Sequence, residues 1–355
     1  MPQPAGPPEV PIAYAPQRVR SLTIDDLEKE AAAYDAVVAL SPDVDQFCSS
    51  HAFVHAAFTG LQPGRTARIY AIGDAANPGY LAFAERSVGL FGDPRPRPLW
   101  EPFEAMWGLA SPVVGTDVRG LALALRDRLI EDGPAAVLLC GLREGSPQLV
   151  ALVRTLDATH RIHGGRATDR QVASLEGGVD GFLSRRSARF RANLRRALKA
   201  AAARGLQHER IVPSSDDEVR ALYERVVSID DRSWKGHAEA GLKGSGLYAF
   251  YLEMLPRLLV SGGLRFHFLV EKGEDVAYLF GGRVGDTFRG LQFAFVAGHE
   301  RESLGNLAQY HALSSLCDEG TLRYDLGTSS EYKLHWGEAV DRSLSFIAVP
   351  RSRAG

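Results

Sequence analysis

The residues best suited to acid–base chemistry lie close together near the C-terminus. Asp325 ends a short predicted strand, and a polar loop that begins at Gly327 leads to Glu331, Tyr332 and Lys333. A carboxylate can accept a proton, a phenol can donate one, and an ammonium can stabilise charge developing on an oxygen. These residues suit attack on a carbonyl group. Asp325 or Glu331 would act as the base, Tyr332 as the proton donor and Lys333 as the cation facing the oxyanion.

A second candidate site opens a predicted helix directly after a predicted strand. Its residues are Ser303, Leu304, Gly305 and Asn306. Free backbone N–H groups at the start of a helix, together with the helix dipole, favour an anionic ligand such as a phosphate. The alternative is an ordinary helix start, in which the hydroxyl of Ser303 caps the first turn.

A strongly basic segment lies between residues 185 and 204. Its basic side chains are not interrupted by any acidic one: Arg185, Arg186, Arg189, Arg191, Arg195, Arg196, Lys199 and Arg204. Arg185, Arg189 and Asn193 share one face of a helix. Like charges at this spacing repel, and a phosphate-bearing ligand or a nucleic acid would relieve the repulsion. The alternative is a solvated basic face that docks against the acidic remainder of the chain.

Other catalytic motifs are not predicted. His51 and His55 have the spacing of two ligands on one helix face, but the glutamate of a His-Glu-x-x-His motif is missing between them, so we predict no metal site. Cys48, Cys140 and Cys317 are scattered without a Cys-x-x-Cys spacing, which is typical of reduced thiols. The sequence contains neither a Gly-x-Ser-x-Gly elbow nor a phosphate-binding loop with Gly-Lys-Ser/Thr.

The elements that must position these residues form a mixed α/β pattern. In the first half, we expect helices at 23–40, 119–131 and from 147, strands at 67–72, 80–84, 88–91 and 135–140, and a proline-rich loop at 94–102. In the second half, we expect helices at 179–204, 216–233, 247–260 and 303–319, with strands at 206–212, 264–270, 276–284, 288–296, 322–326 and 344–349.

Composition limits the class of protein. The chain has 355 residues, enough for about two domains, and its net charge of −2 argues against a protein wrapped mainly in nucleic acid. No stretch approaches the ~18 apolar residues of a membrane span. The first 20 residues are proline-rich without the apolar run of a signal peptide, so we expect a disordered tail, no membrane insertion and a cytoplasmic protein.

The order of the elements resembles the GNAT superfamily of N-acyltransferases, in the branch of the CelD-like acetyltransferases and the Fem-type aminoacyltransferases. The resemblance covers residues 181–340 and depends on four motifs in order: Phe190-Arg-Ala-Asn-Leu-Arg-Arg196, Ser233-Trp-Lys-Gly236, Ser303-Leu-Gly305, and Asp325-Leu-Gly327 followed by Tyr332-Lys-Leu-His-Trp336. Fem-type relatives carry two GNAT-like domains. We therefore expect a degenerate copy at 21–175 and the acyltransferase domain at 176–355.

The resemblance implies transfer of an acyl group from acyl-CoA, for example acetyl-CoA, to an amine by direct attack. It implies that Ser303, Leu304, Gly305 and Asn306 hold the pyrophosphate of the donor and that Lys333 stabilises the oxyanion. It also places the basic helix, with Arg185, Arg189, Asn193 and Arg196, beside the acceptor. Trp234 and Lys235 are acceptor contacts or a lid anchor, and Trp336 is a core residue.

Two alternatives stay open. One is an aminoacyl-tRNA-dependent transferase that forms a peptide bond, which the basic helix favours. The other is a module without catalysis that recognises a phosphate-rich polymer or carrier. The acceptor in either enzyme would be an amine, and a phosphate group on that acceptor would suit the basic helix.

Overall fold

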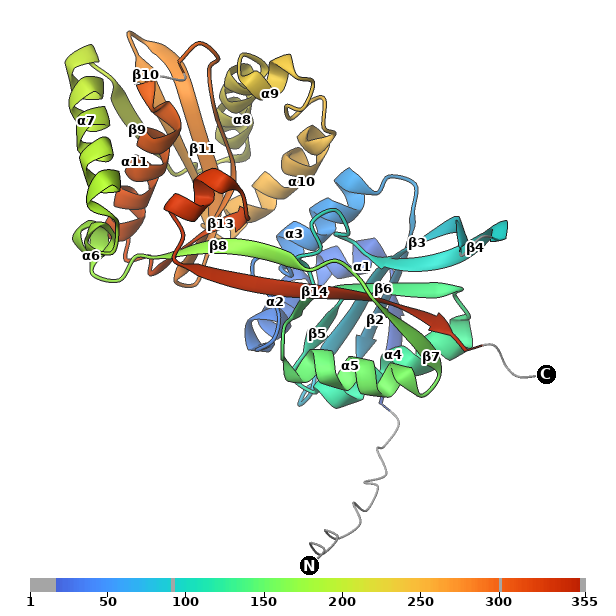
Figure 1. The fold of residues 1–355 in the computed structure, drawn as a ribbon. Helices are drawn as coiled ribbons and strands as arrows, with labels where there is room; N and C mark the ends of the chain where they lie inside the picture. The colour runs from blue at the N-terminus through green and yellow to red at the C-terminus, as the bar shows by residue number, and fades with distance from the viewer. Residues whose placement is uncertain (1–16, 91–92, 300–301, 352–355) are drawn as a thin grey trace, which may run out of the picture.

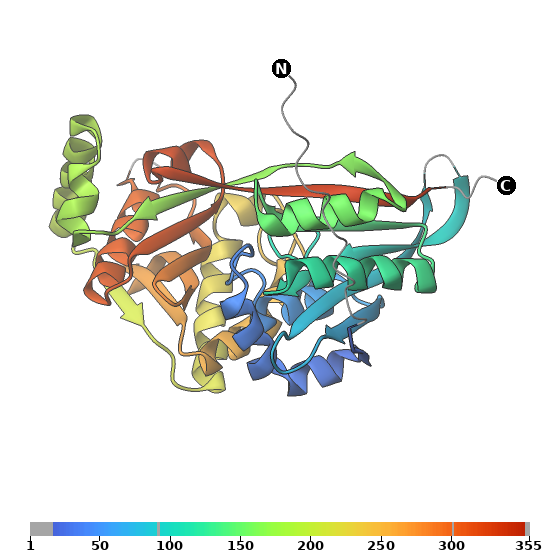
Figure 2. The ribbon, with the colours of Figure 1, turned by 90° about the horizontal axis from the view of Figure 1, so that it is seen from below.

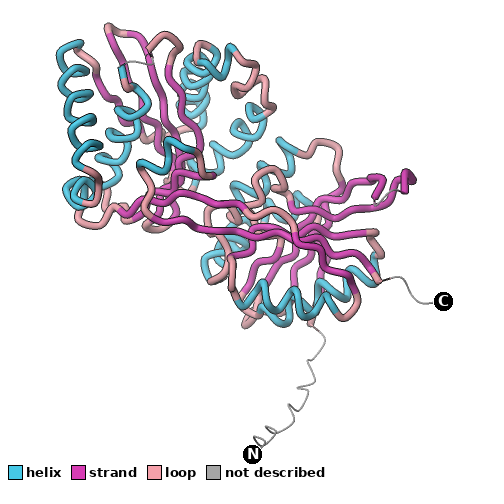
Figure 3. Tube along the Cα trace, in the orientation of Figure 1, coloured by secondary structure: helices cyan, strands magenta, loops and turns pink. Residues whose placement is uncertain are grey.

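The computed structural model describes residues 17–90, 93–299 and 302–351. Most of the predicted N-terminal tail lies outside these ranges, and residues 19 and 20 already belong to the first strand. One mixed sheet of 14 strands runs through both halves of the described chain (Figures 1 and 3). None of the helices in the described ranges combines the length and the hydropathy of a membrane span.

The first half begins with a strand and three short helices that pack beside a meander of strands. Its strands are β1 (Val19–Leu22), β2 (Thr66–Ile72), β3 (Gly79–Leu90), β4 (Asp93–Pro102), β5 (Val113–Gly115), β6 (Ala136–Arg143) and β7 (His160–Gly164). Its helices are α1 (Ile24–Lys29), α2 (Ala31–Leu40), α3 (His51–Ala56), α4 (Val118–Asp132) and α5 (Pro147–Asp157), with a π-helical turn over Ala57–Leu61.

The second half repeats this plan with longer helices. Its strands are β8 (Thr168–Ser174), β9 (Gln207–Ile211), β10 (Leu264–Glu271), β11 (Glu274–Val284), β12 (Thr287–Phe295), β13 (Arg323–Thr328) and β14 (Ala339–Pro350). Its helices are α6 (Gly178–Ser184), α7 (Ala188–Arg204), α8 (Asp216–Asp231), α9 (Trp234–His237), α10 (Leu247–Val260) and α11 (Leu304–Asp318), with a 3₁₀ helix at Glu331–His335.

The same topology occurs in both halves. In the first, the meander β2-β3-β4 is followed by α4 and by β6, which pairs with β4 in parallel. In the second, the meander β10-β11-β12 is followed by α11 and by β13, which pairs with β12 in parallel. This confirms the predicted mixed α/β class and the predicted second copy of the fold.

Strands β8 and β14 join the two halves (Figure 2). β8 pairs with β13 of the second half and with the start of β14, whose later residues pair with β6 and β7 of the first half. Phe346 and Ala348 of β14 are buried in the core of the first half. The domain division at residues 175 and 176 stays a prediction. The structure adds that the last strand of the chain completes the sheet of the first half.

Some local predictions are confirmed because a short segment determines them. Thr23 caps α1, and Asp26 completes the capping box. Gly205 ends α7 in the left-handed conformation, with φ +77°. The helix predicted at 179–204 is instead two helices, because Ser187 adopts an extended backbone and accepts a hydrogen bond from the Phe190 N–H, which starts α7 anew.

Several elements differ from the sequence prediction: the helix expected at 23–40 is two helices, the strands expected at 80–84 and 88–91 are one strand, and β1, β5 and β7 were not predicted. The proline-rich loop is strand β4. Its prolines stand at alternate positions, so the positions that lack a backbone N–H donor face one edge of β4. Strand β6 pairs with β4 only at Leu99 and Trp100. Helix α3 was not predicted because its residues are all buried and show no amphipathic period. Strand β8 was not predicted because Arg170 and Gln171, although polar, are buried at its centre.

Candidate functional site

A cavity of about 580 Å³ opens where β12 and β13 separate. The two strands pair in parallel only between Thr287–Arg289 and Arg323–Asp325. Beyond these pairs they diverge, and residues 290–295 and 326–328 line opposite walls of the cavity. Backbone N–H and C=O groups along such a separated strand can bind an extended ligand through main-chain hydrogen bonds.

Lys333 lines this cavity, at the side of β13. Its Nζ donates a hydrogen bond to the Thr328 carbonyl oxygen at 2.9 Å. Burial lowers the pKa of Lys333 to about 8, and the Arg289 guanidinium contributes to the decrease. Below that pH the side chain is an ammonium with restricted access to water, where its interaction with a negative charge is stronger than at the surface.

Tyr332 also lines the cavity, whereas Glu331 does not. The Tyr332 ring packs on Phe293, with ring centroids 5.2 Å apart, and burial raises the pKa of its phenol. The phenol is therefore protonated at neutral pH and can donate a proton. Glu331 is exposed on the 3₁₀ helix.

Asp325 lies beneath the cavity, in a buried group of charges. Its carboxylate pairs with Arg170 and, at 3.1 Å, with Arg289, and it accepts a hydrogen bond from the Gly327 N–H at 2.8 Å. Asp45 pairs with both arginines from the other side. Asp325 is absent from the cavity wall, and its oxygens already accept from these donors, an arrangement that suits support of Arg289 better than proton transfer.

The start of α11 faces the same cavity. All four predicted donor-binding residues, Ser303 to Asn306, line it. Ser303 adopts φ +60°, and its side chain makes no capping hydrogen bond with any described residue. The ordinary N-cap that was the alternative interpretation is therefore not formed within the described chain. The N–H groups in the first turn of a helix have no partner within the helix, so a helix start that lines a cavity can bind an anion.

Two contacts explain how this helix start is held. The Trp336 Nε1–H donates to Asn306 Oδ1 at 3.2 Å, and Trp336 itself is 1% exposed, which confirms the predicted core position. A Cβ added to Gly305 would lie 3.4 Å from the rings of both Phe293 and Phe295. Position 305 therefore accommodates little more than a methyl group.

Trp234 and Lys235 reach the cavity from α9. The Lys235 Nζ donates to Gln292 Oε1 at 3.1 Å and to the Phe293 carbonyl oxygen at 2.9 Å, and burial lowers its pKa. Trp234 is 57% exposed although it contributes to the cavity wall. An exposed aromatic ring at the edge of a cavity can contact an incoming ligand.

The basic helix does not reach the cavity. Arg185, Arg189, Asn193 and Arg196 are exposed and absent from the cavity wall, and α7 lies at the outer side of the second half (Figure 1). Arg185 pairs with Glu338 at 3.1 Å. Arg189 and Arg196 have no carboxylate partner within 4.0 Å among the described residues. The alternative of a basic face docked on acidic groups thus fits the two ends of the segment, where Arg185 pairs with Glu338 and Arg204 pairs with Glu271 and Glu302, but not the exposed charges between them.

Several cavity residues have no signal in the sequence. Cys48, Phe53 and Trp107 come from the first half, and Arg289 and Phe250 from strand β12 and helix α10. They are remote from one another along the chain and belong to no motif. The Arg289 Nη2 donates to Cys48 Sγ at 2.8 Å, but burial raises the pKa of the thiol well above its ordinary value. Cys48 is therefore protonated and a poor nucleophile.

The corresponding gap in the first half is filled by the chain itself. After β4 the segment that follows packs against β6, where the Gly141 N–H donates to the Gly108 carbonyl oxygen at 3.0 Å. The buried Glu104 holds this segment by accepting hydrogen bonds from four backbone N–H groups, those of residues 107–110. The segment carries Trp107 and Leu109 into the wall of the second-half cavity. The first copy of the fold thus shapes the site of the second.

Comparison with known proteins agrees with this architecture. Residues 188–334 match the family described as an acetyltransferase (GNAT) domain. No curated protein matches the sequence. The solved structure of FemX superposes with a TM-score of 0.63 at 13% identity, over 92% of this chain and 96% of that one.

Two further structures have the same fold. A conserved protein of unknown function from Bacteroides thetaiotaomicron gives a TM-score of 0.60 at 11% identity, over 94% of this chain and 99% of that one. The C-terminal domain of a putative lysylphosphatidylglycerol synthetase from Agrobacterium fabrum gives 0.54 at 12% identity, over 92% and 93%. Identities this low establish the fold alone. Residues 188–334 are thus similar to the acetyltransferase (GNAT) domain family, and the described chain as a whole has a FemX-like fold with two halves of GNAT-like topology.

Proposed function

We propose that the protein transfers an acyl group from a coenzyme A thioester to an amine in the cavity between β12 and β13. The observation that carries this proposal is the convergence of three features on one cavity. These are the separated strand edges, the uncapped start of α11, and the Lys333 ammonium. The donor phosphates would lie at residues 303–306, the pantetheine arm along β12, and the reacting carbonyl near Lys333.

In this reaction the amine attacks the thioester carbonyl, a C–N bond forms and the C–S bond breaks. The Lys333 ammonium stabilises the negative charge on the carbonyl oxygen, and the Tyr332 phenol supplies the proton that the leaving thiolate needs. The attacking nitrogen, which carries a positive charge once the C–N bond has formed, then gives a proton to the Tyr332 phenolate in the same cavity. The protons balance without a group from outside the cavity.

The lining of the cavity bears on the class of acceptor. Among the described residues, no aspartate, glutamate or histidine lines the cavity, so a side-chain base of the usual kind is absent there. The amine should therefore arrive largely uncharged. At pH 7 about a tenth of α-amino groups, with a pKa of about 8, are uncharged, whereas fewer than about one in a thousand lysine-like amines, with a pKa of about 10.4, are uncharged, so an α-amino group suits this cavity better.

Direct transfer is favoured over a covalent intermediate. Cys48 is the cysteine that lines the cavity among the described residues, and its thiol is protonated. The serines of the lining, Ser303, Ser329 and Ser330, have no histidine in the cavity to activate them. Neither kind of nucleophile is prepared for attack.

The donor site can be tested with a pair of variants at Gly305. Gly305→Asp places a carboxylate and a side chain larger than a methyl group at the helix start, and should weaken acyl-CoA binding roughly tenfold or more, because the charge repels the phosphates and the added volume exceeds the space at position 305. Gly305→Ala adds only a Cβ, which lies 3.4 Å from Phe293 and Phe295, and should bind nearly as well as the wild type. Isothermal titration calorimetry with acetyl-CoA and a longer acyl-CoA measures both. Equal affinities for the two variants would contradict a phosphate site at residue 305.

A second candidate function, an aminoacyl-tRNA-dependent transferase, is favoured by the exposed charges of α7. Arg189, Arg195, Arg196 and Lys199 are exposed and have no carboxylate within 4.0 Å among the described residues. A phosphate backbone would neutralise such a row of charges and release counterions. Binding of tRNA without transfer of an acyl group from acyl-CoA or of an aminoacyl group from tRNA would support the third possibility, a module that only binds.

The role of α7 can be tested by removing two of these charges. Arg189→Gln combined with Arg196→Gln should raise the KM for a phosphate-bearing acceptor or donor and reduce the dependence of binding on salt. The variant should fold normally, because exposed charges contribute little to stability. Arg154→Gln with Arg161→Gln, two exposed arginines of the first half, is the matched control. If only the melting temperature falls and the kinetics are normal, the helix is structural.

A further inference from the structure

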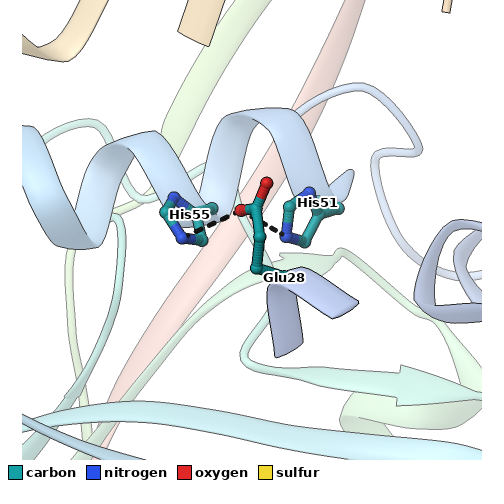
Figure 4. A group of neighbouring side chains, drawn as sticks. All are labelled: Glu28, His51 and His55. Atoms are coloured by element: carbon teal, nitrogen blue, oxygen red, sulfur yellow. Dashed lines mark ion pairs between the residues drawn. The ribbon is translucent and has the colours of Figure 1, made fainter. Parts of the chain in front are cut away.

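A group of three potential metal ligands lies in the first half, apart from the acyl-transfer cavity. Figure 4 shows Glu28 of α1 directed toward His51 and His55, which lie one turn apart on α3. The Nε2 atom of His51 is 3.5 Å from Glu28 Oε2, and the Nε2 atom of His55 is 3.1 Å from the same oxygen. The three donor atoms all lie within 4.8 Å of one another.

The two carboxylate–imidazole separations are close to those between the ligands of a metal site. Ligand atoms about 2.1 Å from a zinc ion at tetrahedral angles lie about 3.4 Å apart. The two measured distances lie on either side of this value. One imidazole nitrogen from each histidine and one carboxylate oxygen are a ligand set that zinc and related ions bind with an open fourth position.

The two imidazoles lack other partners for these atoms. His51 is 3% exposed and His55 is 7% exposed, and His51 Nε2 makes no hydrogen bond with any described residue. A buried ring nitrogen without a partner is costly, and a bound cation would supply one. Burial also lowers the pKa of both histidines, that of His51 to about 4, so the rings are neutral at neutral pH.

The surroundings hold the ligands in place and leave a route to solvent. The Asp35 carboxylate accepts a hydrogen bond from the His51 backbone N–H at 2.6 Å, which fixes the start of α3. Arg257 contacts Glu28 Oε2 at 3.0 Å and also pairs with Glu253 at 3.2 Å. Because Arg257 and both histidines face this one oxygen, an ion bound there would displace the Arg257 guanidinium, which keeps its pair with Glu253. The Glu28 side chain is 45% exposed, so an ion can enter from its side.

We propose that Glu28, His51 and His55 bind a divalent transition-metal ion of the zinc type. The ion would tie α1 to α3. Phe53 lies between the two histidines in sequence. It is two residues from each, which is about 200° of rotation around the helix, so it lies on the opposite face of α3, where it lines the acyl-transfer cavity. The metal would thus hold the helix that supplies one wall of the cavity, and it takes no part in acyl transfer itself.

The test uses the full chain, freed of metal with a chelator and titrated with Zn²⁺ by calorimetry and with Co²⁺ by visible absorption. The wild type should bind one ion at this site and melt at a higher temperature with Zn²⁺ present. His55→Ala and Glu28→Gln should each weaken binding by about 100-fold or more and remove the Co²⁺ absorption. Because Glu28 is half-exposed, Glu28→Gln provides the test even if His55→Ala folds poorly.

A second group of possible ligands provides the control. Glu271, His299 and Glu302 also lie within 4.8 Å of one another, but this group has one partly exposed imidazole instead of two buried ones, and Arg204 pairs with both of its carboxylates, at 2.7 and 3.3 Å. His299→Ala should therefore leave the tight Zn²⁺ site and its Co²⁺ spectrum unchanged. The proposal is overturned if the wild type binds Zn²⁺ no better than Glu28→Gln, or if His299→Ala alone abolishes binding.

Discussion

Lys333→Met should lower kcat by about 10²–10³ while the affinity for the donor changes little. Removal of one group that stabilises an oxyanion typically costs about 2.7–4 kcal/mol in the transition state. The neutral carbonyl of the bound donor interacts more weakly with the ammonium, so the effect falls on kcat and not on binding. Methionine keeps most of the length of the lysine stem and removes the charge. Steady-state kinetics and calorimetry with acyl-CoA separate the two quantities.

The pH profile gives an independent test of the same role. Because the pKa of Lys333 is about 8, the ammonium is lost as the pH rises through this value, and kcat should fall there. In Lys333→Arg the cation persists above pH 8, so the decrease in kcat through this pH should disappear, even if the variant is slower than the wild type at every pH. A kcat that rises through pH 8 in the wild type but not in Lys333→Met would make Lys333 a base, because deprotonation of the acceptor would raise kcat in both enzymes. A Lys333→Met enzyme within about threefold of the wild type (under about 1 kcal/mol) would exclude the catalytic role.

Asp325→Asn should reduce the free energy of unfolding by about 3–5 kcal/mol, the usual cost of breaking a buried ion pair. Asp325 faces Arg170 and Arg289, and both arginine side chains are less than a tenth exposed. Asparagine keeps the shape of the side chain and can still accept from the Gly327 N–H. Only the charge is lost, and one buried guanidinium is left without compensation.

Urea denaturation of Asp325→Asn, followed by circular dichroism, measures this effect. The matched control is Asp169→Asn. Asp169 precedes Arg170 in the sequence, and its partly exposed carboxylate pairs with Arg342. The control should leave the denaturation midpoint unchanged, because exposed pairs contribute little. A midpoint for Asp325→Asn equal to that of the control would show that Asp325 is not needed to hold Arg289. The kinetics of its folded fraction would then test Asp325 as a base.

Much of the fold could be predicted because local rules act over a few residues. The cap at Thr23, the end of α7 at Gly205 and the second-half strands from β9 onward follow from side-chain hydrogen bonds, backbone freedom and alternating hydrophobicity. The same rules fail at α3 and β8. Burial on all sides removes the amphipathic period of α3, and the buried Arg170 makes β8 resemble a loop.

For the site, the sequence alone determined the motifs that are continuous in the chain. Ser303 to Asn306, Tyr332 and Lys333 lie in the cavity wall, as does Lys235. Their positions follow from where a helix begins and where a strand ends. The predicted roles of these residues remain to be tested by the variants above.

Only the tertiary structure decided which remote groups meet. It removed Asp325 from the cavity by pairing it with Arg170 and Arg289, and it brought Glu28 to His51 and His55 although no glutamate stands between the histidines. The physical reason is that the availability of a carboxylate depends on its burial and on the charges that surround it. Segments far apart in the sequence supply those charges, and no local pattern records them.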